Sequence, residues 1–219
     1  YSTEHYRYWA QRLARAGWQI AVHAIGDSAC RGVIRLAEDI LDTASDHRWR
    51  VEHAQVVHPR DRERMTRAGL IPSVQPTHAI SDRKWAGDRL GDREAYAYSY
   101  ADLLAGAGFL PLGTDFPIEE IYPLRTYGAA VFRQDTAGLP PEGYRKEQAL
   151  RPEQALRGMT HWPARAAFQE ASQGRLIQGH TADFVIYPQD ITRLSRVELS
   201  SLKPSATFLA GEQVYRDSQ

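Results

Sequence analysis

Short apolar runs alternate with longer stretches of helical periodicity through the first half of the chain. Each run has the length of a buried strand, and a polar residue or a proline follows it. The stretches between the runs place apolar residues three or four positions apart, which is the spacing of one helix face. The four runs lie at residues 18–22, 49–52, 70–75 and 109–113. This order predicts parallel strands joined by crossover helices, in an open doubly wound sheet or in part of a (β/α)8 barrel.

Glycine and proline mark the predicted helix boundaries. The first helix places Tyr6 and Trp9 at helical spacing, so its apolar face is expected to pack on the core. Pro59 opens a helix that ends before Gly69, and Gly108 stops another that begins near residue 98. These residues predict the helix ends because proline suits a first helical position and glycine tolerates the conformation that ends a helix.

The pattern changes after residue 115. Helical periodicity predicts helices at residues 123–132 and 152–168, with a loop rich in glycine and proline between them. Later apolar segments have strand length, and Gly211 with Glu212 forms a hairpin turn between the last two. These strands lie at residues 182–187, 206–210 and 213–215. We expect residues 1–173 to form an α/β domain and residues 174–219 to form a small β appendage.

Composition excludes several classes of function. Of 219 residues, 42% are hydrophobic and 25% are charged, which is typical of a soluble globular protein. The 27 basic residues balance the 27 acidic ones, so nothing favours nucleic acid or an anionic membrane. The longest run free of both charged residues and histidine, 103–114, is too short to span a bilayer. The arginine-rich segment 60–67 also contains Asp61 and Glu63, which predicts a solvated helix face.

The cysteine count limits both the compartment and the metal chemistry. Cys30 stands alone, which excludes an internal disulfide and any cysteine-based zinc site. No signal-peptide pattern precedes the first helix, and the expected location is the cytoplasm.

Three polar residues follow predicted strands. His23, His53 and Asp115 each come after an apolar run and before a turn. In a parallel sheet the carboxyl ends of the strands lie on one side, where sites form. Two imidazoles and a carboxylate suit Zn²⁺ or a similar divalent ion, and a carboxylate beside metal-activated water can transfer protons. The plainer interpretation is that the histidines are loop residues and that Asp115 caps the following turn.

Five segments share their pattern, in order, with one protein family. They read AVHAIGD (21–27), RVEHAQ (50–55), SVQP (73–76, with Asp82 and Trp85 downstream), LGTDFP (112–117) and GRLIQGHTADFV (174–185). Together they resemble the amidohydrolase 3 family, whose YtcJ-like members are metal-dependent hydrolases. The resemblance implies a distorted (β/α)8 barrel beside a small β-sandwich, with the metal at the barrel mouth.

The resemblance also implies roles for individual residues. His23, His53 and Asp115 would close barrel strands five, six and eight. The histidines would bind the metal, with zinc as the expected ion, and Asp115 would bind or adjoin it and shuttle the proton. The reaction would be hydrolysis of an amide, cyclic amide or N-acyl bond in a small molecule. The residues expected to line the substrate pocket are Gln75, His78, Asp82 and Trp85.

The resemblance also implies a His-x-His pair on the first barrel strand and a bridging lysine or glutamate on the fourth, and this part of the family pattern is absent here. No His-x-His pair occurs, and the three lysines lie away from predicted strand ends. The chain starts at Tyr1 rather than Met, so we expect the C-terminal half of an amidohydrolase, inactive alone, that self-associates or needs an N-terminal half. Two alternatives stay open. One is a catalytically silent half-barrel that acts as an assembly module, and the other is a metal-free lyase or isomerase.

Overall fold

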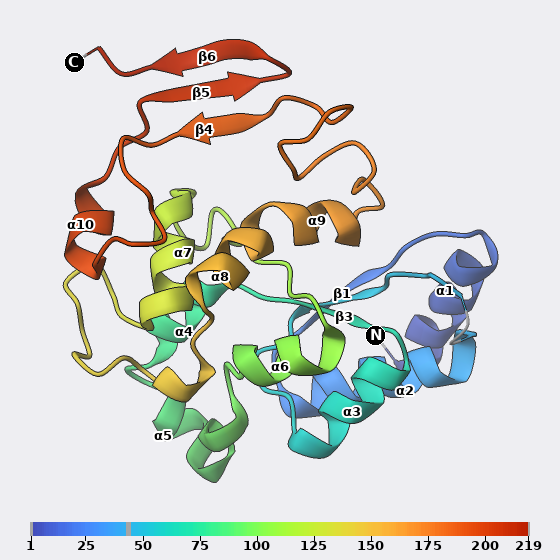
Figure 1. Ribbon diagram of the computed structural model, residues 1–219. Coiled ribbons are helices and arrows are strands. Elements are labelled where there is room, and N and C mark those ends of the chain that lie inside the picture. Colours follow the sequence, from blue (N-terminus) through green and yellow to red (C-terminus); the bar gives the residue numbers. More distant parts are fainter. Residues whose placement is uncertain (1, 43–44, 219) are drawn as a thin grey trace. The chain divides into compact units, whose positions relative to one another are not determined.

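The computed structural model describes residues 2–42 and 45–218 (Figure 1). The chain divides into two compact units, one of residues 1–74 and 84–110 and the other of residues 75–83 and 111–219. Each unit combines helices with a three-stranded sheet, which confirms the predicted α/β class. The boundary expected between residues 173 and 174 stays a prediction.

A parallel sheet organises the first unit. Its strands lie in the order β1 (Ala21–Ala24), β2 (Arg50–His53) and β3 (Ile71–Ser73), as the alternating pattern predicts. The register places Ala24 opposite His53, so β1 and β2 end side by side. The helices of this unit are α1 (Thr3–Arg15), α2 (Asp27–Ile40), α3 (Pro59–Arg67), α5 (Ala86–Leu90), the 3₁₀ helix η1 (Gly91–Tyr96) and α6 (Tyr100–Ala107).

Helix α2 shows how the apolar pattern becomes a packed face. Cys30, Val33, Ile34 and Ala37 are buried, and their spacing of three or four residues puts them on one side of the helix. Fully burying a branched aliphatic side chain contributes about 1.5–3 kcal/mol. The N-cap of α2 is Gly26, so the helix begins at Asp27 as its first residue.

Single proline and glycine residues predicted several helix ends correctly. Pro59 is the first residue of α3, and Gly69 and Gly108 follow helix ends with φ of +66° and +77°. These left-handed conformations are free of strain for glycine, which has no Cβ. Helix α7 (Pro123–Phe132) matches its predicted bounds.

The second unit joins short helices to an antiparallel sheet, drawn in orange and red in Figure 1. Strand β5 (Ala206–Leu209) lies between β4 (Phe184–Ile186) and β6 (Glu212–Arg216). The turn before β6 has positive φ at Ala210 and Gly211, the conformation of a tight hairpin. The remaining elements are α4 (Pro76–Asp82), α7, the 3₁₀ helix η2 (Lys146–Gln148), α8 (Pro152–Met159), α9 (His161–Ala166) and α10 (Arg196–Ser201).

The structure corrects some of the predicted elements. Residues 109–113 form no strand and contain only an isolated bridge residue, Leu112, whose N–H donates to the Gly158 carbonyl. The helix predicted over 152–168 is two helices, α8 and α9, with a break at Thr160. Helix α10 was not predicted, although Ser195 and Glu198 form a capping box at its start.

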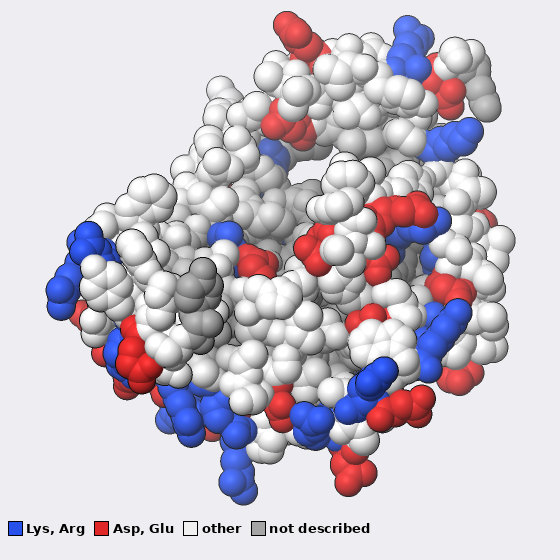
Figure 2. Space-filling model, turned by 180° about the vertical axis from the view of Figure 1, so that it is seen from behind, with Lys and Arg blue, Asp and Glu red and all other residues white. Residues whose placement is uncertain are grey.

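Two predicted surfaces also differ from expectation. Tyr6 and Trp9 are 54% and 47% exposed, and Ala10 is the residue of α1 that is buried. Asp61, predicted on a solvated face, is buried because α3 turns it toward Arg31 of α2. On the face in Figure 2, acidic and basic side chains lie side by side. Among the described residues, no helix is long and apolar enough to cross a membrane.

Candidate functional site

The two histidines predicted as metal ligands meet at the ends of β1 and β2. Their ring centroids are 4.5 Å apart with an interplanar angle of 76°. His53 is 7% exposed, whereas His23 lies on an exposed edge strand. The register pairs His23 with Glu52 and Ala24 with His53, so the two histidines are diagonal neighbours on adjacent strands. The sequence therefore predicted this pair correctly as neighbours.

The backbone at His53 is held in an uncommon conformation. His53 and Ala54 have φ of +71° and +41°, values that are unusual for residues with a Cβ. Hydrogen bonds fix the next residues: the N–H of Tyr98 donates to the Gln55 carbonyl at 2.7 Å, and the Gln55 amide donates to the Tyr98 hydroxyl at 2.8 Å. Strained backbone persists where surrounding contacts determine it, and it often marks functional positions.

Asp115 belongs to the second unit and also has positive φ, +58°. Its turn is closed by backbone and hydroxyl groups: the N–H of Ile118 donates to the Asp115 carbonyl, and the N–H of Phe116 donates to Thr114 Oγ1. Within the described chain, the Asp115 carboxylate accepts no backbone N–H and is 38% exposed. The side chain therefore does not act as the turn cap that the plainer interpretation expected.

A further histidine, His78, faces the carboxylate of Asp115. Nε2 of His78 lies 3.8 Å from Oδ2 of Asp115, and the two residues are 37 positions apart in sequence. His78 is the third residue of α4, and it is buried, as is Gln75, the N-cap of this helix. The sequence pattern predicted His78 as a residue of the substrate pocket and did not predict its approach to Asp115. This approach was predictable in part from the sequence, because His78 and Asp115 both follow predicted strands.

The remaining predicted pocket residues divide between the units. Asp82 follows Gln75 and His78 on α4 at a spacing that keeps all three on the same side of the helix. Trp85 is the N-cap of α5 in the first unit and is 48% exposed.

Cys30 is excluded as a reactive group by its surroundings. It is fully buried, and this burial raises the pKa of its thiol to about 12. The thiol donates to the Ala24 carbonyl, so it is a packing residue behind β1.

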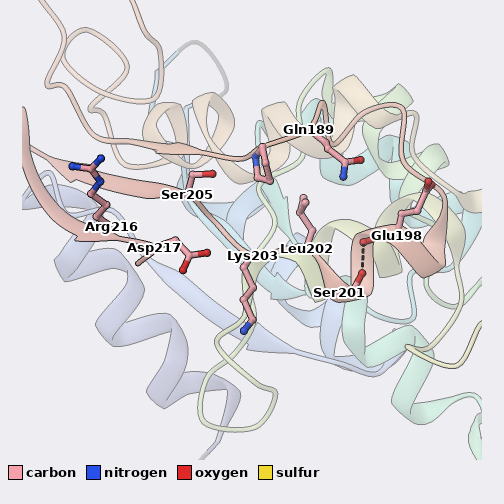
Figure 3. Close-up of a pocket in the computed structure, with 9 residues that line it drawn as sticks. Gln189, Glu198, Ser201, Leu202, Lys203, Ser205, Arg216 and Asp217 are labelled. Atoms are coloured by element: carbon pink, nitrogen blue, oxygen red, sulfur yellow. Dashed lines mark hydrogen bonds between the residues drawn. The ribbon is translucent and has the colours of Figure 1, made fainter. Parts of the chain in front are cut away.

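A pocket of about 620 Å³ lies in the second unit, away from the predicted site residues in sequence (Figure 3). Lys203, Arg216, Glu198 and Asp217 line it together with polar and apolar neighbours. Glu198 already serves α10 as part of its capping box. Its lining combines two basic and two acidic side chains, so no single sign of charge dominates it.

Comparison with known proteins decides the family. A model described as the amidohydrolase family matches residues 1–215. The chain belongs to this family. It is 31% identical to YtcJ of Bacillus subtilis, named as an amidohydrolase, over 95% of this chain and 39% of that protein. It is 24% identical to N-substituted formamide deformylase of Arthrobacter pascens, over 92% of this chain and 37% of that protein.

A solved structure supports the same relationship. An uncharacterized metal-dependent hydrolase from Pyrococcus horikoshii OT3 matches with a TM-score of 0.78 and 30% identity, over 90% of this chain and 39% of that one. The chain spans between 35% and 39% of the length of the curated relatives it matches. The amidohydrolase resemblance is confirmed, and the chain is related to hydrolases.

Proposed function

We propose that this amidohydrolase chain contributes half of a metal centre to a hydrolase that cleaves C–N bonds in amides, cyclic amides or N-acyl compounds. The observation that carries the proposal is the pair formed by His23 and His53 at adjacent strand ends. The family and the names of the relatives support the reaction class. The proposal also treats β1, β2 and β3 as consecutive strands of a barrel and β4 to β6 as part of a β-sandwich.

The donor set fits a divalent ion. Zinc takes imidazole nitrogen and carboxylate oxygen at about 2.0–2.2 Å, and the close approach of the two rings, 4.5 Å between centroids, supports a shared ion. Neutral imidazoles with a carboxylate also match other borderline divalent ions, and zinc is our first choice. A bound ion would polarise the scissile carbonyl and lower the pKa of water to about 7. We propose that His23, His53 and Asp115 hold it.

Asp115 would move the proton. Its carboxylate is partly exposed and is not used by its own turn, so it can accept a proton from the attacking water. The same carboxyl group can then give the proton to the leaving nitrogen, which completes hydrolysis without another acid. Gln75, Asp82 and Trp85 are proposed to contact the substrate, whose amide and carbonyl groups they could bind by hydrogen bonds and ring contact.

Metal binding by the 219-residue chain tests this proposal. Equilibrium dialysis against Zn²⁺, followed by elemental analysis, measures bound metal in the wild type, His23→Ala and His53→Ala. We expect both variants to lose most of the bound zinc. His5→Ala is the control, because His5 is an exposed histidine on α1. Equal zinc in all four proteins, with circular dichroism confirming that they are folded, would remove the metal centre.

A catalytically silent assembly module is the second candidate. The edge strand β1 is largely exposed, and Trp18 and Ile25 beside it are 66% and 39% exposed. Apolar surface next to a strand edge favours association. This candidate predicts association by light scattering together with no zinc uptake, whereas the metal centre predicts zinc uptake whatever the oligomeric state.

A further inference from the structure

His78 is placed to act on Asp115 rather than on a substrate. The two side chains are 10% and 38% exposed, so the histidine has little surface to offer to a bound molecule. Its Nε2 nevertheless faces Oδ2 of Asp115 at 3.8 Å. This distance exceeds a normal hydrogen bond, but such contacts are often long in empty sites and shorten when the site is filled.

The segments that carry the two residues are tied together. Ser81 Oγ on α4 donates to Oε1 of Glu119, four residues beyond Asp115, at 2.7 Å. Arg83, directly after α4, donates to Oδ2 of Asp135 at 2.6 Å. Helix α4 also packs against α7 in the same unit. The Ser81–Glu119 bond joins α4 to the loop that carries Asp115, and the other two contacts join α4 to α7 and to the segment after it.

Asp115 needs such a partner to have a defined orientation. Its backbone is fixed at φ +58°, but within the described chain its carboxylate accepts no backbone N–H. We propose that His78 is the positioning residue for Asp115: Nε2–H would donate to Oδ2, which would leave Oδ1 available to a bound metal and its water. This inference rests on the proposed function and gives His78 a role different from the substrate contact predicted from sequence.

Three substitutions of His78 separate positioning from packing. Gln carries its amide nitrogen at about the reach of Nε2, whereas Asn carries it at about the reach of Nδ1, and Ala carries none. Titration of the 219-residue chain with Co²⁺, followed by its visible absorption, measures affinity and ligand geometry. We expect His78→Ala to weaken binding by roughly 10- to 100-fold, the usual effect of losing a group that orients a ligand.

The comparison of His78→Gln with His78→Asn decides whether His78 positions Asp115. His78→Gln should recover most of the wild-type affinity and absorption spectrum, and His78→Asn should not. Equal weakening in all three variants would assign His78 to packing alone, and unchanged affinity in His78→Ala would remove its role. If His78→Ala fails to fold, the comparison of Gln with Asn still decides.

A double-mutant cycle in urea makes the test independent of metal. If the wild type takes up no Co²⁺, the proposed metal centre fails, and the cycle of His78→Ala and Asp115→Asn then judges the contact. We expect the unfolding constant of the double variant to differ by at least about threefold from the product of the single effects. The control cycle pairs His78→Ala with Glu212→Gln on exposed β6, which should be additive. Additivity in both cycles would overturn the proposed contact.

Discussion

Asp61 is a carboxylate that the fold buries between two arginines. Its side chain is 3% exposed, and it accepts from Nε of Arg31 at 2.8 Å and from Nη1 of Arg64 at 3.0 Å. Arg31 lies on α2 and Arg64 on α3, so this one carboxylate joins two helices. Asp61→Asn keeps the shape of the side chain, removes its charge and turns an amide NH₂ toward one guanidinium.

The expected loss of stability in Asp61→Asn depends on how exposed the two arginines are. Breaking a fully buried ion pair costs about 3–5 kcal/mol. Here the Arg31 and Arg64 side chains are 39% and 26% exposed, and Arg64 also binds Glu38 at 2.6 and 3.0 Å. Water and Glu38 therefore compensate part of the loss. We expect Asp61→Asn to lower the free energy of unfolding by about 2–3 kcal/mol.

The chain offers a matched control for this prediction. Asp39 pairs with Arg7 at 2.7 Å, but their side chains are 50% and 42% exposed. An exposed pair of this kind contributes about 0–1 kcal/mol, so Asp39→Asn should change stability little. Urea unfolding followed by circular dichroism, with an unchanged m value, measures both variants. If Asp61→Asn costs no more than Asp39→Asn, burial does not strengthen this pair and the reasoning is wrong.

Three further predictions concern Asp115 and Cys30. Asp115→Asn should lower the kcat of the whole enzyme by about 10²-fold or more while its melting temperature stays near that of the wild type. Normal turnover in this variant would remove the catalytic role proposed for Asp115. Cys30 should react with a thiol reagent at pH 8 only as fast as the chain unfolds, and rapid labelling of the native protein would contradict its burial. Because burial raises the pKa of this thiol to about 12, its contribution to stability should fall as pH rises from about 9 toward 12, a slope that Cys30→Ala should remove.

Helix boundaries were predictable wherever one residue sets the backbone locally. Pro59 and Pro123 are first helical residues because proline fixes φ and needs no hydrogen-bond partner for its nitrogen. Residues 109–113 were less predictable, since strand formation depends on a neighbour that the apolar run itself does not specify.

The pair of histidines was predictable for a related reason. A parallel sheet places the ends of neighbouring strands together, so histidines in the last two positions of β1 and β2 lie on adjacent strands, and their ring centroids are 4.5 Å apart. The order of apolar runs predicted the strands, and the family motifs predicted the chemistry. The sequence therefore determined the α/β class and the family, and it predicted the approach of the two histidines.

Only the tertiary structure decided which side chains meet across large separations in sequence. His78 approaches Asp115 because α4 and the loop after Leu112 are tied by Ser81 and Glu119. Asp61 is buried although its helix is rich in charge, because α2 supplies Arg31 at the matching position. Periodicity describes one element at a time, whereas burial and pairing depend on the elements packed against it, and packing is a property of the whole fold.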